Sequence, residues 1–157
     1  MAKIIPLTER EYQEGDYERY IRNLTEEHMK PHFVEHFGGW SRAVSEKKFR
    51  KLLQTGTVKL FFHQSKFVGY YTLDVEKDNE NSYLLHDLHV VDAFKGKGKG
   101  KEILLKVLAK AKEDGKEQVK AFVFLDNPAK RFYEANGFTV IEMLQKSHSA
   151  VMVWNRR

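Results

Sequence analysis

The chain has 157 residues, of which 41% are hydrophobic and none is cysteine. This length allows a sizeable core and is too short for two ordinary domains, so we expect one domain over residues 1–157. The absence of cysteine excludes disulfides, thiolate nucleophiles and cysteine-based metal sites. No apolar run approaches the roughly 20 residues that span a bilayer, and residues 1–6 do not resemble a signal peptide. A cytoplasmic protein without a membrane partner is therefore expected.

The net charge of +5 is spread unevenly along the chain. Between Phe94 and Arg131, eleven Lys or Arg residues stand against five acids, a local balance of +6. The densest positive charge coincides with a group of glycines, whereas nucleic-acid surfaces usually spread basic residues along a face. This distribution favours a compact polyanionic ligand and argues against a nucleic-acid partner.

The first half of the chain alternates between strand and helix patterns. In chain order we expect a strand over residues 3–7, helices over residues 12–24, 29–37 and 46–54, and a hairpin of strands 57–63 and 66–75. Pro31 should interrupt the second helix, because proline removes a helical hydrogen bond. Ser45 should cap the third helix. Gln64-Ser65 is the expected hairpin turn, and residues 78–81 are expected to form the next one.

The second half predicts a strand over residues 83–91, a long amphipathic helix over 98–114, a strand over 119–125, a short helix over 127–136 and a final hairpin of 139–144 and 150–154. Gly115 should end the long helix. The run from Val119 to Leu125 is almost wholly apolar, which is typical of a central strand covered on both faces. Asn127 can cap the short helix, with Pro128 in its first turn. This order predicts a mixed α/β sheet.

Glycine and lysine alternate from Lys95 to Lys101, between a predicted strand and a predicted helix. Glycines let backbone N–H groups approach an anion closely, and the helix N-terminus adds partial positive charge. The turn therefore predicts a pyrophosphate cradle. A Walker A loop is excluded because Gly100-Lys101 is followed by Glu102, and a dinucleotide fingerprint is excluded because Lys101 holds the place of its third glycine. Neither ATP hydrolysis nor NAD binding is supported.

The segment Lys95-Gly96-Lys97-Gly98-Lys99-Gly100 resembles motif A of the GNAT superfamily of N-acetyltransferases, Gln/Arg-x-x-Gly-x-Gly/Ala. Leu88-His89-Val90 before it and Ile103-Leu104-Leu105 after it fit the family's strand and helix. Lys95 stands where the family has Arg or Gln. A lysine has the positive charge of an arginine but lacks its planar guanidinium group.

A second block, residues 127–138, resembles the superfamily's motif B, Asn-x-x-Ala-x-x-x-Tyr-x-x-x-Gly-Phe. Ala129, Tyr133 and Gly137-Phe138 match at the expected spacings. The position of the motif asparagine holds Asp126, and Asn127 comes one residue late. Two motifs in the right order, separated by a helix and a strand, make a chance match improbable.

The resemblance implies a GNAT-like fold: a mixed, mostly antiparallel sheet of about seven strands, flanked by helices and splayed between strands four and five. It also implies acetyl-CoA as cosubstrate, no metal, and an oxyanion-binding N–H group at Val90. Tyr133 takes the place of the general acid. The expected acetyl-CoA-binding residues are Leu88, His89, Val90, Lys95, Gly96, Lys97, Gly98, Lys99, Gly100, Lys101, Asn127, Ala129, Lys130, Phe132 and Tyr133.

His86 is the candidate general base. Strand alternation predicts that its side chain shares a face with Val90, while Asp87 points to the other face. Polyamine N-acetyltransferases resemble this segment with Glu-Asp in place of His86-Asp87, so His86 takes the place of their base. A neutral imidazole can accept an ammonium proton directly or through water. A hydrogen-bonded strand histidine without a catalytic role is the alternative.

His28, His32 and His36 recur every four residues, a spacing that invites a zinc hypothesis. The interruption expected at Pro31 and the lack of an HExxH pattern favour a structural or solvated role. The aromatic residues of the first helices are expected in the core. In the superfamily these first helices wall the acceptor side, so the resemblance implies that some of these aromatic residues, with Glu26 or Glu27, face the acceptor.

These observations predict an acetyl-CoA-dependent N-acetyltransferase that transfers its acetyl group directly to a small-molecule or peptide amine in a ternary complex. Direct transfer is expected because no cysteine can carry an acetyl group. The alternative is a non-catalytic acyl-CoA-binding or sensor module with the same fold, and a basic nucleic-acid-binding domain ranks third. The sequence leaves open which amine is the acceptor and whether the chain forms a homodimer.

Overall fold

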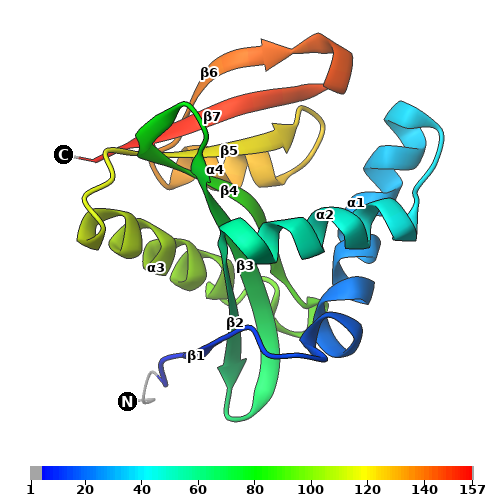
Figure 1. Cartoon of the computed structure of the whole chain (residues 1–157), viewed down its shortest axis with the longest axis vertical. Coiled ribbons are helices and arrows are strands. Elements are labelled where there is room, and N and C mark those ends of the chain that lie inside the picture. The colour runs from blue at the N-terminus through cyan, green and yellow to red at the C-terminus, as the bar shows by residue number, and fades with distance from the viewer. Residues whose placement is uncertain (1–4, 157) are drawn as a thin grey trace.

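The computed structural model describes residues 5–156. Figure 1 shows a twisted central sheet with helices packed around it. The seven strands stand in the order β1-β2-β3-β4-β5-β7-β6. They are β1 (Thr8–Glu11), β2 (Thr57–His63), β3 (Lys66–Glu76), β4 (Asn79–Val90), β5 (Gln118–Phe124), β6 (Thr139–Leu144) and β7 (Ser149–Asn155). The helices are the π-helical turn η1 (Tyr17–Ile21), α1 (Arg22–Phe37), α2 (Arg42–Thr55), α3 (Lys99–Glu113) and α4 (Ala129–Ala135), with 3₁₀ turns η2 (Asp92–Phe94) and η3 (Gln145–Ser147).

The sheet buries a separate apolar cluster on each face. Neighbouring strand residues go to opposite clusters, as Tyr70 and Tyr71 of β3 do, because strand side chains alternate. The cluster that contains Tyr71 also contains Ile103 and Leu104 of α3. The cluster that contains Tyr70 is covered by η1, α1 and α2, and Figure 1 shows α2 crossing the sheet beside α1 and apart from α3. The two helical layers thus enclose the sheet from both sides.

Strands β4 and β5 pair in parallel over a short stretch only. Their register runs from Ser82 to Leu85 on β4, although β4 itself continues to Val90. Val91 donates its N–H to the Val68 carbonyl at 2.9 Å. Since successive N–H groups of a strand point in opposite directions, the N–H of Val90 points away from β3 and toward the β5 side. The strands therefore diverge where the sequence predicts the splay.

A β-bulge in β4 changes which side chains share a face. Thr72 of β3 pairs with Asp87 and the next residue, Leu73, pairs with Leu85, so His86 is the extra residue. The alternation predicted for this strand is therefore wrong at His86, because an inserted residue shifts the side-chain phase. His86 and Asp87 both face the α1–α2 side and line one cavity there.

Other features of the fold follow the predictions closely. The hairpin of β2 and β3 turns at Gln64-Ser65, both with positive φ. Gly115 follows α3 with a φ of +73°. Among residues 5–156, no helix is both long enough and apolar enough to cross a membrane.

Several local predictions are wrong. The helix predicted over residues 12–24 begins only at η1, because residues 12–15 are not helical. The first strand is β1, so residues 5–7 precede it, and residues 3 and 4 of the predicted strand lie outside the described residues. The turn before β4 lies at residues 77–78, since β4 already begins at Asn79. Helix α1 runs through Pro31 without a break. Pro31 is exposed, so water can satisfy the carbonyl that its missing N–H leaves free. Helix α2 begins earlier than predicted, and Ser41 rather than Ser45 caps it by accepting the Val44 N–H at 3.2 Å.

Candidate active site

The glycine–lysine turn (residues 95–101) leads from η2 into α3. Gly96 and Gly98 have φ of +74° and +76°, a left-handed conformation that only glycine adopts without strain. Gly98 is the N-cap of α3, and no atom lies within 4 Å of the position of a Cβ at either glycine. Left-handed residues next to a helix N-terminus turn successive N–H groups toward one point, which suits a pyrophosphate.

The lysines of this turn differ in their contacts. Lys95 lies 2.8 Å from an Asp92 carboxylate oxygen, and Lys99 lies 3.4 Å from Glu102. Lys97 sits over the Phe94 ring at 5.8 Å, while Lys101 is exposed. Among residues 5–156, neither Lys97 nor Lys101 forms an ion pair by distance, so their charges are available to an anion.

Helix α4 packs directly against the start of α3. A Cβ on Gly100 would lie 3.6 Å from the Phe132 ring and 3.8 Å from Val90 Cγ2. The turn, the end of β4 and α4 therefore meet at Gly100. The side-chain oxygen of Asn127 accepts a hydrogen bond from the Ala129 N–H at 2.9 Å and so binds the first residue of α4.

Tyr133 lies in α4, one residue after Phe132, and is 7% exposed. Its ring packs against Phe138 with centroids 5.1 Å apart. Burial raises the pKa of Tyr133, and the negative charge of Asp87 raises it further. The phenol is thus protonated at neutral pH, as a proton donor must be.

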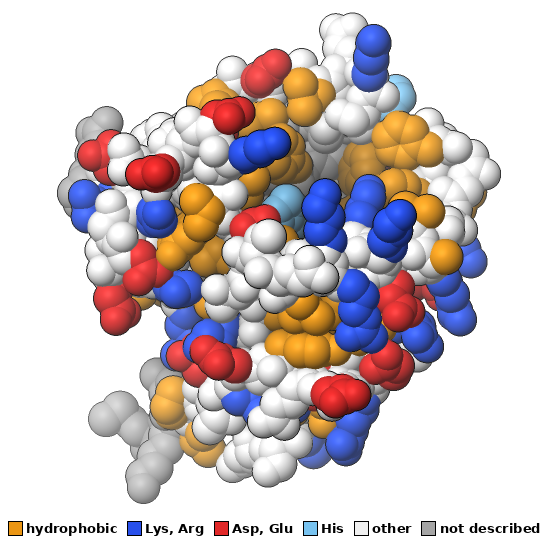
Figure 2. Space-filling view, in the orientation of Figure 1, with side chains coloured by type: hydrophobic (Ala, Val, Ile, Leu, Met, Phe, Trp, Pro, Cys, Tyr) orange, Lys and Arg blue, Asp and Glu red, His pale blue; other side chains and the backbone are white. Residues whose placement is uncertain are grey.

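A cavity of about 700 Å³ lies between α1, α2 and the sheet. We refer to it as the α1–α2 pocket. Figure 2 shows a hollow on this side of the molecule, with hydrophobic side chains around it and Lys or Arg side chains at its rim. Its apolar walls include Met29, Phe33, Trp40, Phe49 and Tyr70. Its charged or titratable lining residues are Lys48, Lys51, Asp74, His86 and Asp87.

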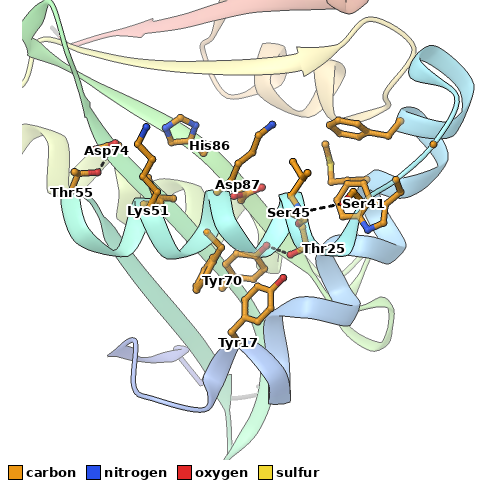
Figure 3. Close-up of a pocket in the computed structure, with 18 residues that line it drawn as sticks. Tyr17, Thr25, Ser41, Ser45, Lys51, Thr55, Tyr70, Asp74, His86 and Asp87 are labelled. Carbon is orange, nitrogen blue, oxygen red and sulfur yellow. Dashed lines mark hydrogen bonds between the residues drawn. The ribbon is translucent and has the colours of Figure 1, made fainter.

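Figure 3 shows how the polar groups of this pocket are arranged. His86 and Asp87 project from β4, and Lys51 of α2 points toward His86. Deeper in the pocket, the hydroxyl groups of Thr25 and Tyr70 are hydrogen-bonded to each other. Tyr70 carries no motif signal in the sequence, and the resemblance to polyamine N-acetyltransferases marks Asp87 only as the neighbour of the candidate base. The pairing of β3 with β4 places both residues at the pocket.

Asp87 is held as an anion by its neighbours. Burial opposes its charge, but contacts with His89 and Thr72 outweigh this effect and lower the pKa of Asp87. Thr72 donates its hydroxyl at 2.8 Å, and His89 Nε2 lies 3.4 Å from the other carboxylate oxygen. The Asp87 side chain is still 26% exposed. An anionic group accessible to a ligand therefore lies beside His86.

Most of the predicted site residues lie at the end of β4, in the glycine–lysine turn or in α4. Val90, Gly100 and Phe132 meet at the start of α3, and Ala129, Lys130 and Tyr133 lie on the same helix as Phe132. Leu88 packs against the cluster on the α3 face, whereas the His89 side chain contacts His28 and Asp87. The His89 side chain thus lies on the α1 side of the sheet, opposite that of Leu88.

The aromatic and acidic residues of the first helices that were expected to face an acceptor do not all line this pocket. Tyr17, Met29, Phe33 and Trp40 line the α1–α2 pocket, but Glu26 and Glu27 do not. Glu26 instead forms a two-pronged ion pair with Arg42, at 2.8 Å for each bond. The acids at the pocket are Asp74 and Asp87.

Comparison with known proteins identifies the family of the chain. Residues 23–153 match the family model described as an acetyltransferase (GNAT) domain. No curated protein matches the chain in sequence.

Solved structures show the same fold. The PaiA N-acetyltransferase of Thermoplasma acidophilum, solved with coenzyme A, superposes with a TM-score of 0.73 at 21% identity, covering 97% of this chain and 100% of that one. A GNAT family acetyltransferase of Elizabethkingia anophelis with acetyl-CoA bound gives 0.72 at 14% identity, covering 96% and 98%. Ard1 of Thermoplasma volcanium gives 0.73 at 18% identity, covering 98% and 99%. With the family model matching most of its length, the chain belongs to the GNAT family of acetyltransferases.

Proposed function

We propose that this protein is an acetyl-CoA-dependent N-acetyltransferase that transfers an acetyl group directly to an amine in a ternary complex. One observation carries the proposal: a single strand reaches both the α1–α2 pocket and the end of the glycine–lysine turn. Asp87 of β4 lines the α1–α2 pocket, and Val90 of β4 touches the start of α3 where the glycine–lysine turn ends. A donor held by the turn and an acceptor held in the pocket would therefore meet at β4.

The residues near the turn suit the donor. Acetyl-CoA supplies an activated thioester and a pyrophosphate. The N–H groups of residues 95–101 and the free charges of Lys97 and Lys101 bind the pyrophosphate. The Val90 N–H, which points toward the β5 side, donates to the acetyl carbonyl oxygen and stabilises the negative charge that develops there. Tyr133, kept protonated by burial, gives its proton to the departing thiolate.

The α1–α2 pocket suits an amine. The Asp87 carboxylate attracts an ammonium group, while the aromatic walls fit an apolar body. His86 is exposed beside Asp87 and takes the ammonium proton, directly or through water. Since the chain has no cysteine to carry an acetyl group, the amine attacks the thioester itself.

Steady-state kinetics test this mechanism. With acetyl-CoA and an amine varied together, a ternary complex gives double-reciprocal lines that intersect. Parallel lines would show an acetyl-enzyme and would overturn direct transfer. Tight binding of coenzyme A without thiol release in the presence of any amine would instead favour a non-catalytic acyl-CoA-binding module.

A further inference from the structure

Two of the three regularly spaced histidines meet a carboxylate from a distant part of the chain. Because α1 is continuous through Pro31, His32 and His36 lie one helical turn apart on the same face. His28 points elsewhere and contacts His89. The helix break that was expected at Pro31 argued against a metal site. Since this break is absent, that argument does not apply to His32 and His36.

Asp126 completes the cluster from the residues that follow β5. Its carboxylate oxygens lie 3.6 Å from His32 Nδ1 and 3.2 Å from His36 Nε2. One ligand atom from each residue lies within 4.8 Å of the other two. Bonds of about 2.0–2.2 Å to a tetrahedral zinc ion place ligand atoms roughly 3.3–3.5 Å apart, so small side-chain rotations would suffice.

The surroundings of the cluster hold the two imidazoles in place. The ring of His32 stacks on Phe124 at 5.0 Å, and the ring of His36 stacks on Phe124 at 5.5 Å and on His148 at 4.4 Å. The histidine side chains are only 18% and 14% exposed, whereas Asp126 is 43% exposed. Both imidazoles are thus packed against aromatic rings, and the Asp126 carboxylate is accessible from solvent.

We propose that His32, His36 and Asp126 bind one divalent transition-metal ion of the zinc class. Two imidazole nitrogens and one carboxylate oxygen are ligands that Zn²⁺ accepts, whereas Mg²⁺ and Ca²⁺ prefer oxygen ligands alone. The ion would join α1, a wall of the α1–α2 pocket, to the turn that leads into α4. Its role in this proposal is to fix these two elements relative to each other.

Zinc binding to the full chain tests the site. After treatment with a chelator, calorimetric titration with Zn²⁺ should show one ion per chain. At a free Zn²⁺ concentration of 100 times Kd, the Tm should rise by about 5–10 °C. Co²⁺ in place of Zn²⁺ should give the visible absorption of a tetrahedral site.

Substitutions distinguish this site from zinc bound loosely by histidines. His36→Gln and Asp126→Asn should each weaken Zn²⁺ binding by about tenfold or more, because each removes a ligand. His28→Gln is the matched control, since it changes the same residue type on the same helix outside the cluster, and it should bind Zn²⁺ as the natural chain does. Asp126 is exposed, so Asp126→Asn should fold, which circular dichroism checks. Absence of stoichiometric binding, or equal affinity in Asp126→Asn, would overturn the proposal.

Discussion

Nδ1 of His89 on β4 faces Nδ1 of His28 on α1 at 2.9 Å. Only one of the two nitrogens can donate a proton in this contact, so at least one ring must be neutral. Burial and the neighbouring His89 lower the pKa of His28 to about 4. His89 in turn contacts Asp87, which links the protonation of the histidine pair to the acid of the α1–α2 pocket.

Stability should depend on pH through His28. Its pKa is about 4 in the folded chain and about 6.5 in the unfolded chain, so between these values the unfolded chain binds more protons. The free energy of unfolding should therefore fall as pH drops from 6.5 to 4, with a contribution of about 1–3 kcal/mol from this half-buried group. Urea unfolding at pH 7 and pH 4.5 measures the loss. His28→Gln should show a smaller loss than the natural chain, and an equal one would exclude His28 as the cause.

Tyr133→Phe should lower kcat by about ten- to a hundredfold and leave coenzyme A affinity nearly unchanged, because it removes only the proton donor. Tyr71→Phe is the matched control. Tyr71 is also buried, at 2% exposure, and its pKa is also raised by burial, but it packs in the core between β3 and α3. Steady-state kinetics and calorimetry should separate the two variants. Equal kcat in both would remove Tyr133 from the chemistry.

Gly98→Glu should abolish coenzyme A binding through steric block and like charge. Gly115→Glu imposes a similar backbone strain, since the two glycines have φ of +76° and +73° and open space around them. Because Gly115 lies at the other end of α3, the Gly115→Glu variant should be less stable than the natural chain but should still bind coenzyme A. Calorimetry gives the affinities, and retained binding in Gly98→Glu would refute the cradle.

Asp87→Asn should raise KM for a cationic amine by about ten- to a hundredfold, the range expected for a hydrogen bond to a charged group. KM for acetyl-CoA should change little. Asp74→Asn removes the other carboxylate of the α1–α2 pocket and is the control for a general loss of negative charge. If the two variants raise KM equally, Asp87 has no specific contact with the amine.

His86→Gln should lower kcat/KM by about a hundredfold and remove the decline of kcat/KM on the acid side of the pH profile, because an imidazole base is lost. His63→Gln changes a histidine of β2 that does not line the α1–α2 pocket. It should keep the profile of the natural chain. An unchanged profile in His86→Gln would assign the base to another group.

Much of the fold can be predicted from the sequence, because apolar periodicity reports directly on burial. The aliphatic stripe of α3 and the apolar run of β5 place these elements correctly, and Gly96 and Gly98 adopt the positive φ that an anion cradle needs. The bulge at His86 could not be predicted, since it depends on how β3 pairs with β4. Asp87 lies on the face opposite Val90, as the alternation predicts, but its contact with Thr72 and its place in the pocket depend on how β3 pairs with β4.

The cluster of His32, His36 and Asp126 could not be predicted either, because it is formed by contacts between distant segments of the chain. His36 and Asp126 are 90 residues apart, and only the packing of α1 beside the end of β5 brings them together. The continuity of α1 through Pro31 was also not predicted, because the local preference of proline to break a helix does not report that Pro31 is exposed and that water can satisfy the freed carbonyl.

Product analysis by mass spectrometry tests the central claim most directly. The chain is incubated with acetyl-CoA and a panel of primary amines that includes aromatic and aliphatic members. The amounts of acetylated amine and free coenzyme A are then measured. We predict equal amounts of the two products for at least one amine, with formation slowed in Tyr133→Phe. Tight binding of coenzyme A with no acetylated amine across the panel would contradict the assignment as an amine acetyltransferase.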